Sequence, residues 1–186
     1  MIHTAKYSSP IGEMLLAANN TALTGLWLAG QKYFPDSLYK DGENENIILT
    51  SAKKWLDRYF AGKAPSPYDL CLAPEGSEFR RQVWKLLLEI PYGHVTTYGA
   101  LAKALAEALA EKRGVKTMSA QAIGGAVGHN PISVIIPCHR VVGADGSLTG
   151  YAGGIDKKLA LLTLENSSAA ELLKSSRYLS AGYLLS

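Results

Sequence analysis

The period of the hydrophobic pattern changes along the chain, and this change restricts the fold more than any other feature of the sequence. Near the N-terminus, the runs 2–7, 14–18 and 22–28 alternate in the manner of strands. They are separated by Ser-Ser-Pro-Ile-Gly at 8–12 and by Asn-Asn at 19–20, both typical of turns. The pattern predicts a small antiparallel sheet of three strands.

After these runs the period becomes helical. The segment 47–60 places Trp55, Tyr59 and other apolar side chains on one face, so we expect an amphipathic helix that covers the sheet. Residues 35–46 are polar and acidic and predict a surface loop. The segment 61–67 reads Ala-Gly-Lys-Ala-Pro-Ser-Pro, which ends the helix and predicts a linker.

The chain beyond the linker is predicted to be mostly helical. Ser77, Thr97 and Ser119 each precede a helical pattern as N-cap residues, and a last helix is expected over 156–165. An apolar run at 132–136 predicts a strand. The fold class is therefore α/β in the broad sense and α+β in detail. The expected parts are an N-terminal α/β domain over 1–67, a second domain over 68–166 and a tail over 167–186, to which we assign no function.

Composition excludes several classes of protein. The net charge of +3 permits a nucleic-acid partner without requiring one. No apolar run approaches the roughly 20 residues of a membrane span, and the N-terminus lacks a signal-peptide pattern, so we expect a cytoplasmic protein without membrane contact. A reducing compartment favours free thiols at Cys71 and Cys138, with Cys71 buried and inert. These cysteines and the four histidines lack zinc spacing, so no metal is expected.

The run Ile-Ile-Pro-Cys-His-Arg-Val-Val at 135–142 places a thiol between apolar pairs and beside an imidazole. A free cysteine is mostly protonated at neutral pH, and His139 is a base that can make Cys138 nucleophilic. Neighbouring residues on a strand point to opposite faces, so contact requires the chain to turn at Pro137. The alternative is that Cys138 is a small buried apolar residue and His139 a core histidine with satisfied hydrogen bonds.

The helices predicted after Thr97 and Ser119 are consistent with a helix-turn-helix unit. The second of them contains Gly124 and Gly125, and a glycine inside a helix costs about 1 kcal/mol relative to alanine. The pair therefore implies that something approaches this helix closely. Tight packing within the domain and contact with a nucleic acid explain it equally well.

Taken together, the residues from Phe79 to Glu165 resemble the O6-alkylguanine-DNA alkyltransferases, a family of DNA repair proteins. The resemblance implies a ribonuclease H-like N-terminal domain and a second domain, similar to a winged helix-turn-helix, that carries the active cysteine. The N-terminal part is similar only in its order of strands and helix. The motifs that carry the resemblance are Ile-Pro-Cys-His-Arg-Val-Val at 136–142, Gly-Gly-Ala at 124–126, Asn130-Pro131, Thr-Tyr-Gly at 97–99 and Gly-Tyr-Ala-Gly-Gly at 150–154.

The resemblance implies a role for each of several residues. Cys138 would accept the alkyl group from the exocyclic oxygen of guanine, once per molecule, because a thioether is a poor leaving group. His139 would be the base, acting through a water, and Glu165 the carboxylate that orients it. Tyr98 would give a proton to the departing guanine, and Asn130 would hold the active-site turn. Without the resemblance, Glu165 reads as a solvated residue at a helix end.

The implied partner is double-stranded DNA containing O6-alkylguanine, met in the minor groove with the damaged nucleotide rotated out of the stack. No cofactor is implied, and a monomer is expected. The residues implied to line the pocket of the rotated base are Val127, Ser133, Val141, Tyr151 and Ala152. The candidate DNA-binding residues are Thr97, Lys112, Arg113, Lys116, Ala120, Gln121, Gly124 and Arg140, the last also as a structural residue behind the cysteine.

This sequence departs from the family pattern at two places. The family commonly carries an arginine that fills the gap left by the rotated base, and the matching residue here is Gln121, so we expect weaker DNA binding without loss of chemistry. The connection 106–117 between the two helices is long, and its Lys112, Arg113 and Lys116 are hypothesised to contact phosphates. Some members also hold a zinc ion in the N-terminal domain, but this sequence lacks the cysteines for one.

Two readings of other classes stay open beside the alkyltransferase. One is a DNA-binding module without chemistry, either a lesion sensor or a regulator, although the known sensors of this kind replace the acceptor cysteine that this chain keeps. The other is a cysteine hydrolase that uses Cys138 and His139 and would process many substrates per thiol. Within the alkyltransferase reading, the alkyl group preferred and the repair of O4-alkylthymine also stay open.

Overall fold

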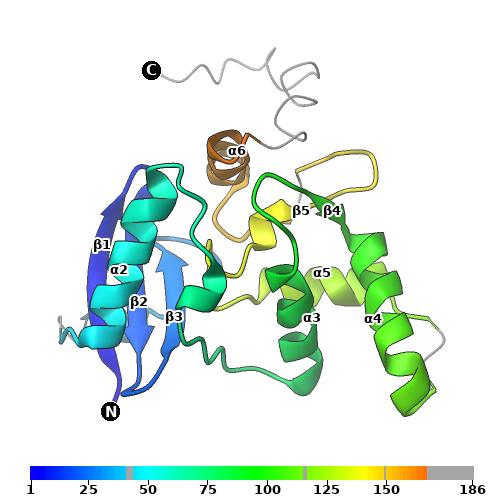
Figure 1. Ribbon diagram of the computed structural model, residues 1–186, viewed down its shortest axis with the longest axis horizontal. Coiled ribbons are helices and arrows are strands. Elements are labelled where there is room, and N and C mark those ends of the chain that lie inside the picture. Colours follow the sequence, from blue (N-terminus) through cyan, green and yellow to red (C-terminus); the bar gives the residue numbers. More distant parts are fainter. Residues whose placement is uncertain (41–43, 115–116, 149, 167–186) are drawn as a thin grey trace.

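The structure is a computed structural model, in which a sheet with its covering helix forms one side of the molecule and a group of helices the other (Figure 1). No helix in the described part of the chain is long and apolar enough to cross a membrane. The predicted tail 167–186 lies outside the described residues. The structure describes residues 1–40, 44–114, 117–148 and 150–166, and of 39, 40 and 111–113 only the backbone.

The order of the elements follows the order predicted from the periodicity, with several short additions. The strands are β1 His3–Ser9, β2 Gly12–Ala18, β3 Leu23–Leu28, β4 Thr96–Thr97 and β5 Val141–Val142. The helices are α1 Asp36–Lys40, α2 Ile47–Phe60, α3 Glu78–Leu88, α4 Tyr98–Arg113, α5 Ala120–Gly128 and α6 Ile155–Leu164, with 3-10 turns η1 Pro67–Asp69 and η2 Cys138–Arg140.

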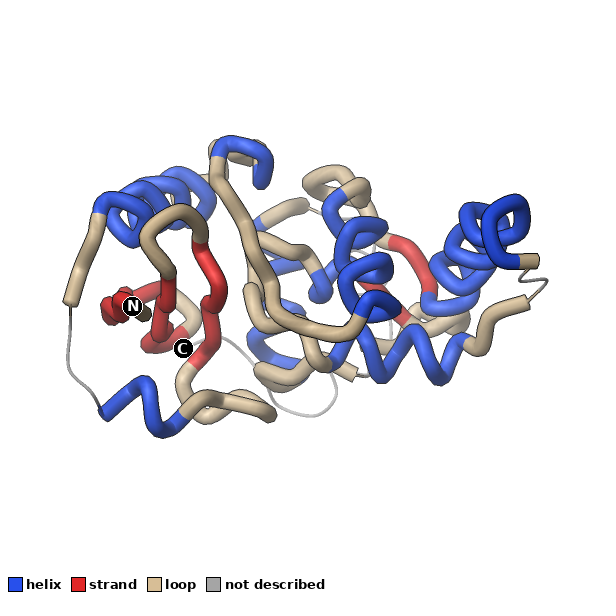
Figure 2. Tube along the Cα trace, turned by 90° about the horizontal axis from the view of Figure 1, so that it is seen from below, coloured by secondary structure: helices blue, strands red, loops and turns tan. Residues whose placement is uncertain are grey.

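The N-terminal sheet is the predicted meander, with the order β1-β2-β3 and antiparallel pairing throughout. Helix α2 contacts all three strands, and its buried residues recur at the spacing of one helix face, from Leu49 through Ala52 to Tyr59. Figure 2 shows α2 on one side of the strands and α1 on the other. The helix predicted over 47–60 is therefore confirmed, and so is its place over the sheet.

Helices α3, α4 and α5 pack against one another, and Trp84 on α3 lies in their core. Its indole Nε1 donates to the carbonyl of Ala126 at 2.9 Å and thereby joins α3 to α5 inside the core. Helix α4 packs against both. The side chains of Ser77, Thr97 and Ser119 each accept a hydrogen bond from a backbone N–H three residues later, which confirms the three predicted N-caps.

The second half of the chain also covers the outer edge of β3. Leu26 donates to the carbonyl of Pro131 and accepts from the N–H of Ser133, both at 2.8 Å. Farther along the strand, Leu23 pairs in the same way with the segment 71–73. A strand edge that stays open can pair with other chains, and here it instead fixes the segment that leads into Cys138.

The strand predicted over 132–136 is wrong. This segment forms a series of turns in which only Ile132 makes a bridge, with Leu26, and Val134 has a φ of 69°, which a strand does not allow. All five residues are buried. The run is apolar because all of its residues are buried, and hydrophobic periodicity cannot distinguish a buried turn from a buried strand.

Two smaller expectations also need correction. Residues 35–46 are not all loop, because Asp36–Lys40 form α1. Cys71 is exposed rather than buried, since its backbone carbonyl pairs with β3 while its side chain faces solvent. The short parallel pair β4·β5, which sets Thr96 opposite Val141, was not predicted, because two residues are too few to show a period.

The N-cap of α2 provides a test of this packing. Asn46 accepts from the N–H of Leu49 and donates to the carbonyl of Asn19, both at 3.0 Å. We expect Asn46→Ala to lower the free energy of unfolding, measured by urea denaturation, by about 1 to 2 kcal/mol. Ser51→Ala on the exposed face of the same helix should change it by less than about 0.5 kcal/mol. Equal losses in the two variants would contradict this account.

Candidate active site

Cys138 begins η2, directly after the buried turns at 132–136. The chain turns at Pro137, the condition that the sequence set for contact between Cys138 and His139. The N–H of Cys138 donates to the carbonyl of Ile136 at 2.8 Å. The sulfur accepts a hydrogen bond from Nδ2 of Asn130 at 3.1 Å. Cys138 is 5% exposed, so its sulfur is held in one place and is nearly enclosed.

Asn130 connects the turn segment to this sulfur. Its Nδ2 also donates to the carbonyl of Ile136 at 2.8 Å, and its Oδ1 accepts from the N–H of Ile132 at 3.0 Å. The buried amide therefore satisfies backbone groups that a neighbouring strand would otherwise satisfy. The side chain of Asn130 thereby ties both ends of the turn segment 132–136 together.

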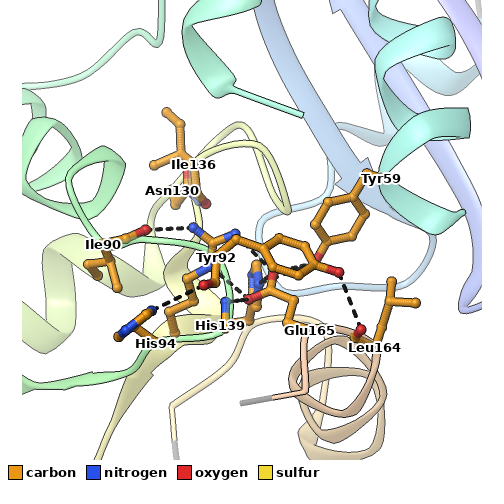
Figure 3. Close-up of polar contacts among 11 residues, drawn as sticks. Tyr59, Ile90, Tyr92, His94, Asn130, Ile136, His139, Leu164 and Glu165 are labelled. Carbon is orange, nitrogen blue, oxygen red and sulfur yellow. Dashed lines mark hydrogen bonds and ion pairs between the residues drawn. The ribbon is translucent and has the colours of Figure 1, made fainter. Parts of the chain in front are cut away.

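The turn η2 brings His139 and Arg140 to the carboxylate of Glu165, the residue that ends α6. Figure 3 shows His139 beside this carboxylate. Nε2 of His139 lies 2.8 Å from Oε1 of Glu165, and both side chains are fully buried. Arg140 donates from Nε to Oε2 and from Nη2 to Oε1, each at 2.9 Å, and its Nη1 donates to the carbonyl of Ile90. The structure thus excludes a solvated Glu165.

This arrangement leaves Nδ1 of His139 as the nitrogen that can act as a base. Since Nε2 faces a carboxylate, which only accepts, Nε2 carries the proton of the neutral ring. Nδ1 is buried and makes no hydrogen bond to any residue that the structure describes. A proton from Cys138 therefore has a buried acceptor on the adjacent residue.

Burial and charge set the protonation states. Burial raises the pKa of the Cys138 thiol by more than the Asn130 hydrogen bond and the charge of Lys158 lower it. Burial likewise lowers the pKa of His139 by more than Glu165 raises it. Burial raises the pKa of Glu165 too, but the hydrogen bonds and charges of His139 and Arg140 outweigh it and hold that pKa well below its usual range. The resting site contains a neutral thiol, a neutral imidazole and a charged carboxylate.

Lys158 lies in the same buried region, although the sequence analysis did not select it. It is fully buried, and its Nζ donates to the carbonyl of Val141 at 2.6 Å. Burial lowers its pKa to about 8, while the charge of Cys138 acts in the opposite direction. Its spacing to Leu161 and Leu162 puts it on the apolar face of α6, and this is the signal that could have identified it.

Tyr98 stands at the start of α4 between two glycines. A Cβ at Gly150 would lie 2.5 Å from the Tyr98 hydroxyl oxygen, and Gly150 has a φ of 87°, so only glycine lets this loop approach the phenol. Gly124 on α5 faces the ring on another side, where a Cβ would lie 3.8 Å away. Burial, with a smaller contribution from Cys138, raises the pKa of Tyr98, so its hydroxyl keeps its proton.

The residues implied to line a base pocket are all buried or partly buried. Val127, Ser133 and Val141 are buried, and the hydroxyl of Tyr151 is buried without a hydrogen bond to any described residue. The carbonyl of Ala152 accepts from the N–H of Lys32 at 3.1 Å, and the hydroxyl of Ser133 donates to Oε1 of Gln31 at 3.1 Å. A loop of the N-terminal half, which the sequence analysis did not connect with the site, therefore supports two of these residues.

Comparison with known proteins decides the family. Residues 78–167 match the family model described as 6-O-methylguanine DNA methyltransferase, DNA binding domain, and residues 2–74 match the one described as its ribonuclease-like domain. The chain belongs to the 6-O-methylguanine DNA methyltransferase family. The α/β fold class predicted from the sequence is thereby confirmed, and the first part of the chain matches a ribonuclease-like domain.

Relatives in this methyltransferase family align with the chain over nearly their whole length. The methylated-DNA–protein-cysteine methyltransferase of Mycobacterium tuberculosis H37Rv is 42% identical over 91% of this chain and 95% of its own. The relative of that name from Methanosarcina acetivorans is 44% identical over 89% of this chain and 99% of its own. The solved structure of Mycobacterium tuberculosis OGT in complex with DNA has a TM-score of 0.74 and 37% identity, covering 92% of this chain and 99% of that one.

In this methyltransferase, α5 presents small residues to solvent. Ala120, Gln121 and Gly125 are exposed, whereas Ile123, Ala126 and Val127 are buried. No described atom would lie within 4 Å of a Cβ at Gly125, and a Cβ at Gly124 would meet only ordinary contacts. Packing inside the protein does not require this glycine pair, so an external partner is the better of the two explanations.

The other candidate DNA contacts of the methyltransferase are placed differently. The expectation that Arg140 contacts DNA is wrong, because its guanidinium is nearly buried and bound to Glu165 and to the carbonyl of Ile90. Only its structural role behind the cysteine fits the structure. The hydroxyl of Thr97 caps α4 through the N–H of Ala100 at 3.1 Å. Lys116 lies outside the described residues, and so do the side chains of Lys112 and Arg113 at the end of α4.

The charge of Lys158 provides a test of the site's electrostatics. We expect Lys158→Met to raise the pKa of Cys138, because the buried cation that favours the thiolate is lost. The pKa would be measured from the ultraviolet absorbance of the thiolate in a Cys71→Ser background. The matched control is Lys157→Met, since Lys157 is the adjacent residue and is partly exposed. This variant should leave the pKa of Cys138 unchanged. A thiol pKa unchanged by Lys158→Met would refute the role of this cation.

Proposed function

We propose that this chain repairs DNA by moving the alkyl group of O6-alkylguanine to the sulfur of Cys138. As a methylated-DNA–protein-cysteine methyltransferase it acts on DNA and takes the alkyl group on a cysteine. One observation identifies Cys138 as the acceptor: the next residue, His139, forms a fully buried pair with Glu165. Cys71, by contrast, is exposed.

The chemistry begins with a neutral thiol. Nδ1 of His139 takes the proton of Cys138 through a water, and Glu165 stabilises the imidazolium that forms. The thiolate then attacks the alkyl carbon, and the bond between that carbon and the guanine oxygen breaks. Its electron pair passes to the guanine, which Tyr98 neutralises by donating a proton, and solvent returns the His139 proton to Tyr98. The product is a thioether, so each molecule acts once.

The exposed face of α5 would contact the DNA. Its small residues allow the backbone to come close in the minor groove, and rotating the damaged nucleotide out of the stack exposes the alkylated oxygen at a cost of a few kcal/mol. Gln121 would fill the gap in the duplex. Val127, Ser133, Val141, Tyr151 and Ala152 would surround the rotated base. The connection with Lys112, Arg113 and Lys116 would add contacts to phosphates.

The acceptor assignment is tested by intact-protein mass spectrometry after incubation with an oligonucleotide that contains O6-methylguanine. The native protein should gain one methyl group, mapped to Cys138, and should stop after one turnover. Cys138→Ala should gain none, while Cys71→Ala should behave like the native protein. A native protein that stays unmodified while it binds the lesion would favour a sensor, and repeated turnover would favour a hydrolase.

The helix-face assignment is tested at Gln121. We expect Gln121→Arg to bind duplex DNA about tenfold more tightly at low salt, because one added charge brings one further phosphate or base contact. The slope of log K against log salt should steepen by about one. The rate of methyl transfer at saturating DNA should change much less. Identical salt titrations for the two proteins would place Gln121 away from the DNA.

A further inference from the structure

One residue of the N-terminal half reaches into the catalytic network. Tyr59 lies at the end of α2, far from Glu165 in sequence, yet its hydroxyl donates to Oε1 of Glu165 at 2.6 Å (Figure 3). The same hydroxyl lies 3.4 Å from Nε2 of His139. Tyr59 has no solvent exposure. Its hydroxyl therefore belongs to the buried network behind Cys138.

Three aromatic side chains pack against the ring of Tyr59. It stacks on Trp55 with ring centroids 5.4 Å apart, and it meets the edges of Phe60 at 5.3 Å and Tyr92 at 6.0 Å. Burial and the charge of Glu165 raise its pKa well above the ordinary value, so the hydroxyl stays a donor. A carboxylate only accepts, and the direction of this hydrogen bond is therefore fixed.

Tyr59 and His139 share one oxygen. Oε1 of Glu165 accepts from Tyr59, from Nε2 of His139 at 2.8 Å and from Nη2 of Arg140 at 2.9 Å. Each donor draws on the same negative charge, so a bond from Tyr59 leaves less of that charge to stabilise an imidazolium. The structure therefore gives the N-terminal half a direct electrostatic connection to the base.

We propose that Tyr59 is a positioning residue for alkyl transfer, which sets the proton affinity of His139 by donating to the carboxylate oxygen that both residues share. This inference rests on the proposed function only for the name of the reaction. The thiol, the base and the carboxylate form the same network toward any electrophile small enough to reach Cys138.

Charged and titratable groups from several elements face His139, and each enters the balance. Glu165 at the end of α6 raises its pKa, whereas burial, Arg140 of η2 and Lys158 of α6 lower it. Tyr92, before β4, lies against the ring of Tyr59 and under the guanidinium of Arg140. Among the residues that the structure describes, Cys138 and Tyr151 also lie beside this network, and Tyr98 interacts with Cys138. Because Tyr59→Phe changes none of these groups, its effect isolates the hydroxyl.

The expected sign follows from this arrangement. Without the Tyr59 hydroxyl, Glu165 keeps more charge for the imidazolium, so the pKa of His139 rises. The thiolate forms when Cys138 gives its proton to neutral His139, so alkylation slows below the pKa of His139. Because that pKa rises, the acid limb of the pH profile of Cys138 alkylation should move to higher pH, by about one unit. Replacement of Tyr59 by 3-fluorotyrosine, a more acidic and stronger donor, should move the limb to lower pH.

The experiment measures the rate of Cys138 carbamidomethylation by iodoacetamide against pH, in full-length protein carrying Cys71→Ser. Tyr7→Phe is the matched control, because Tyr7 also donates to a carboxylate, that of Asp57 on α2 at 2.9 Å, but lies outside the catalytic network. Opposite shifts for Tyr59→Phe and 3-fluorotyrosine, with none for Tyr7→Phe, would establish the role. A limb that stays in place in both Tyr59 proteins, whatever their thermal stability, would overturn it.

This measurement is independent of the repair reaction. If the limb moves but no methyl group is taken from O6-methylguanine, the proposed function fails and the role of Tyr59 stands. If methyl transfer occurs but the limb does not move, the proposed function stands and Tyr59 serves packing alone. Methyl transfer rates of the same variants with an O6-methylguanine oligonucleotide should follow the same shifted pH profile.

Discussion

The buried carboxylate of Glu165 is the feature on which the rest of the site depends. Removing a carboxylate from water costs several kcal/mol, and a protein tolerates it only where charges and donors surround it. Arg140 binds it with two nitrogens, and His139, Tyr59 and the N–H of Gly93 complete the set. These donors come from η2, from α2 and from the segment before β4, so these segments must come together for the carboxylate to be satisfied.

This dependence explains why an N-terminal half without a reacting atom belongs to the active protein. Its β3 edge fixes the segment that ends at Cys138, through Leu26. Its loop supports Ser133 and Ala152 through Gln31 and Lys32. Its helix α2 delivers Tyr59 to the carboxylate. The sheet is therefore a scaffold whose edge, loop and covering helix each contact the site at a different point.

The sequence predicts the elements that have a regular period or a cap, and it fails where tertiary contacts decide. The meander, α2 and the caps at Ser77, Thr97 and Ser119 were accessible because each depends on local residues. The turns at 132–136 could not be predicted from local residues, because their hydrogen-bond partners are the side-chain amide of Asn130 and the edge of β3. In the site, motif resemblance found Cys138, His139 and Glu165. It missed Lys158 and Tyr59, whose partners lie far away in sequence or on unrelated elements.

We conclude that Cys138 rests as a neutral thiol beside a neutral His139, which Glu165 holds with the proton on Nε2. Nitrogen-15 NMR of the His139 imidazole across a pH titration, with Cys138 intact, reports this protonation state. We expect a neutral ring protonated at Nε2 at neutral pH and a pKa of His139 below the ordinary value for histidine. An imidazolium at neutral pH, paired with a Cys138 thiolate, would contradict it.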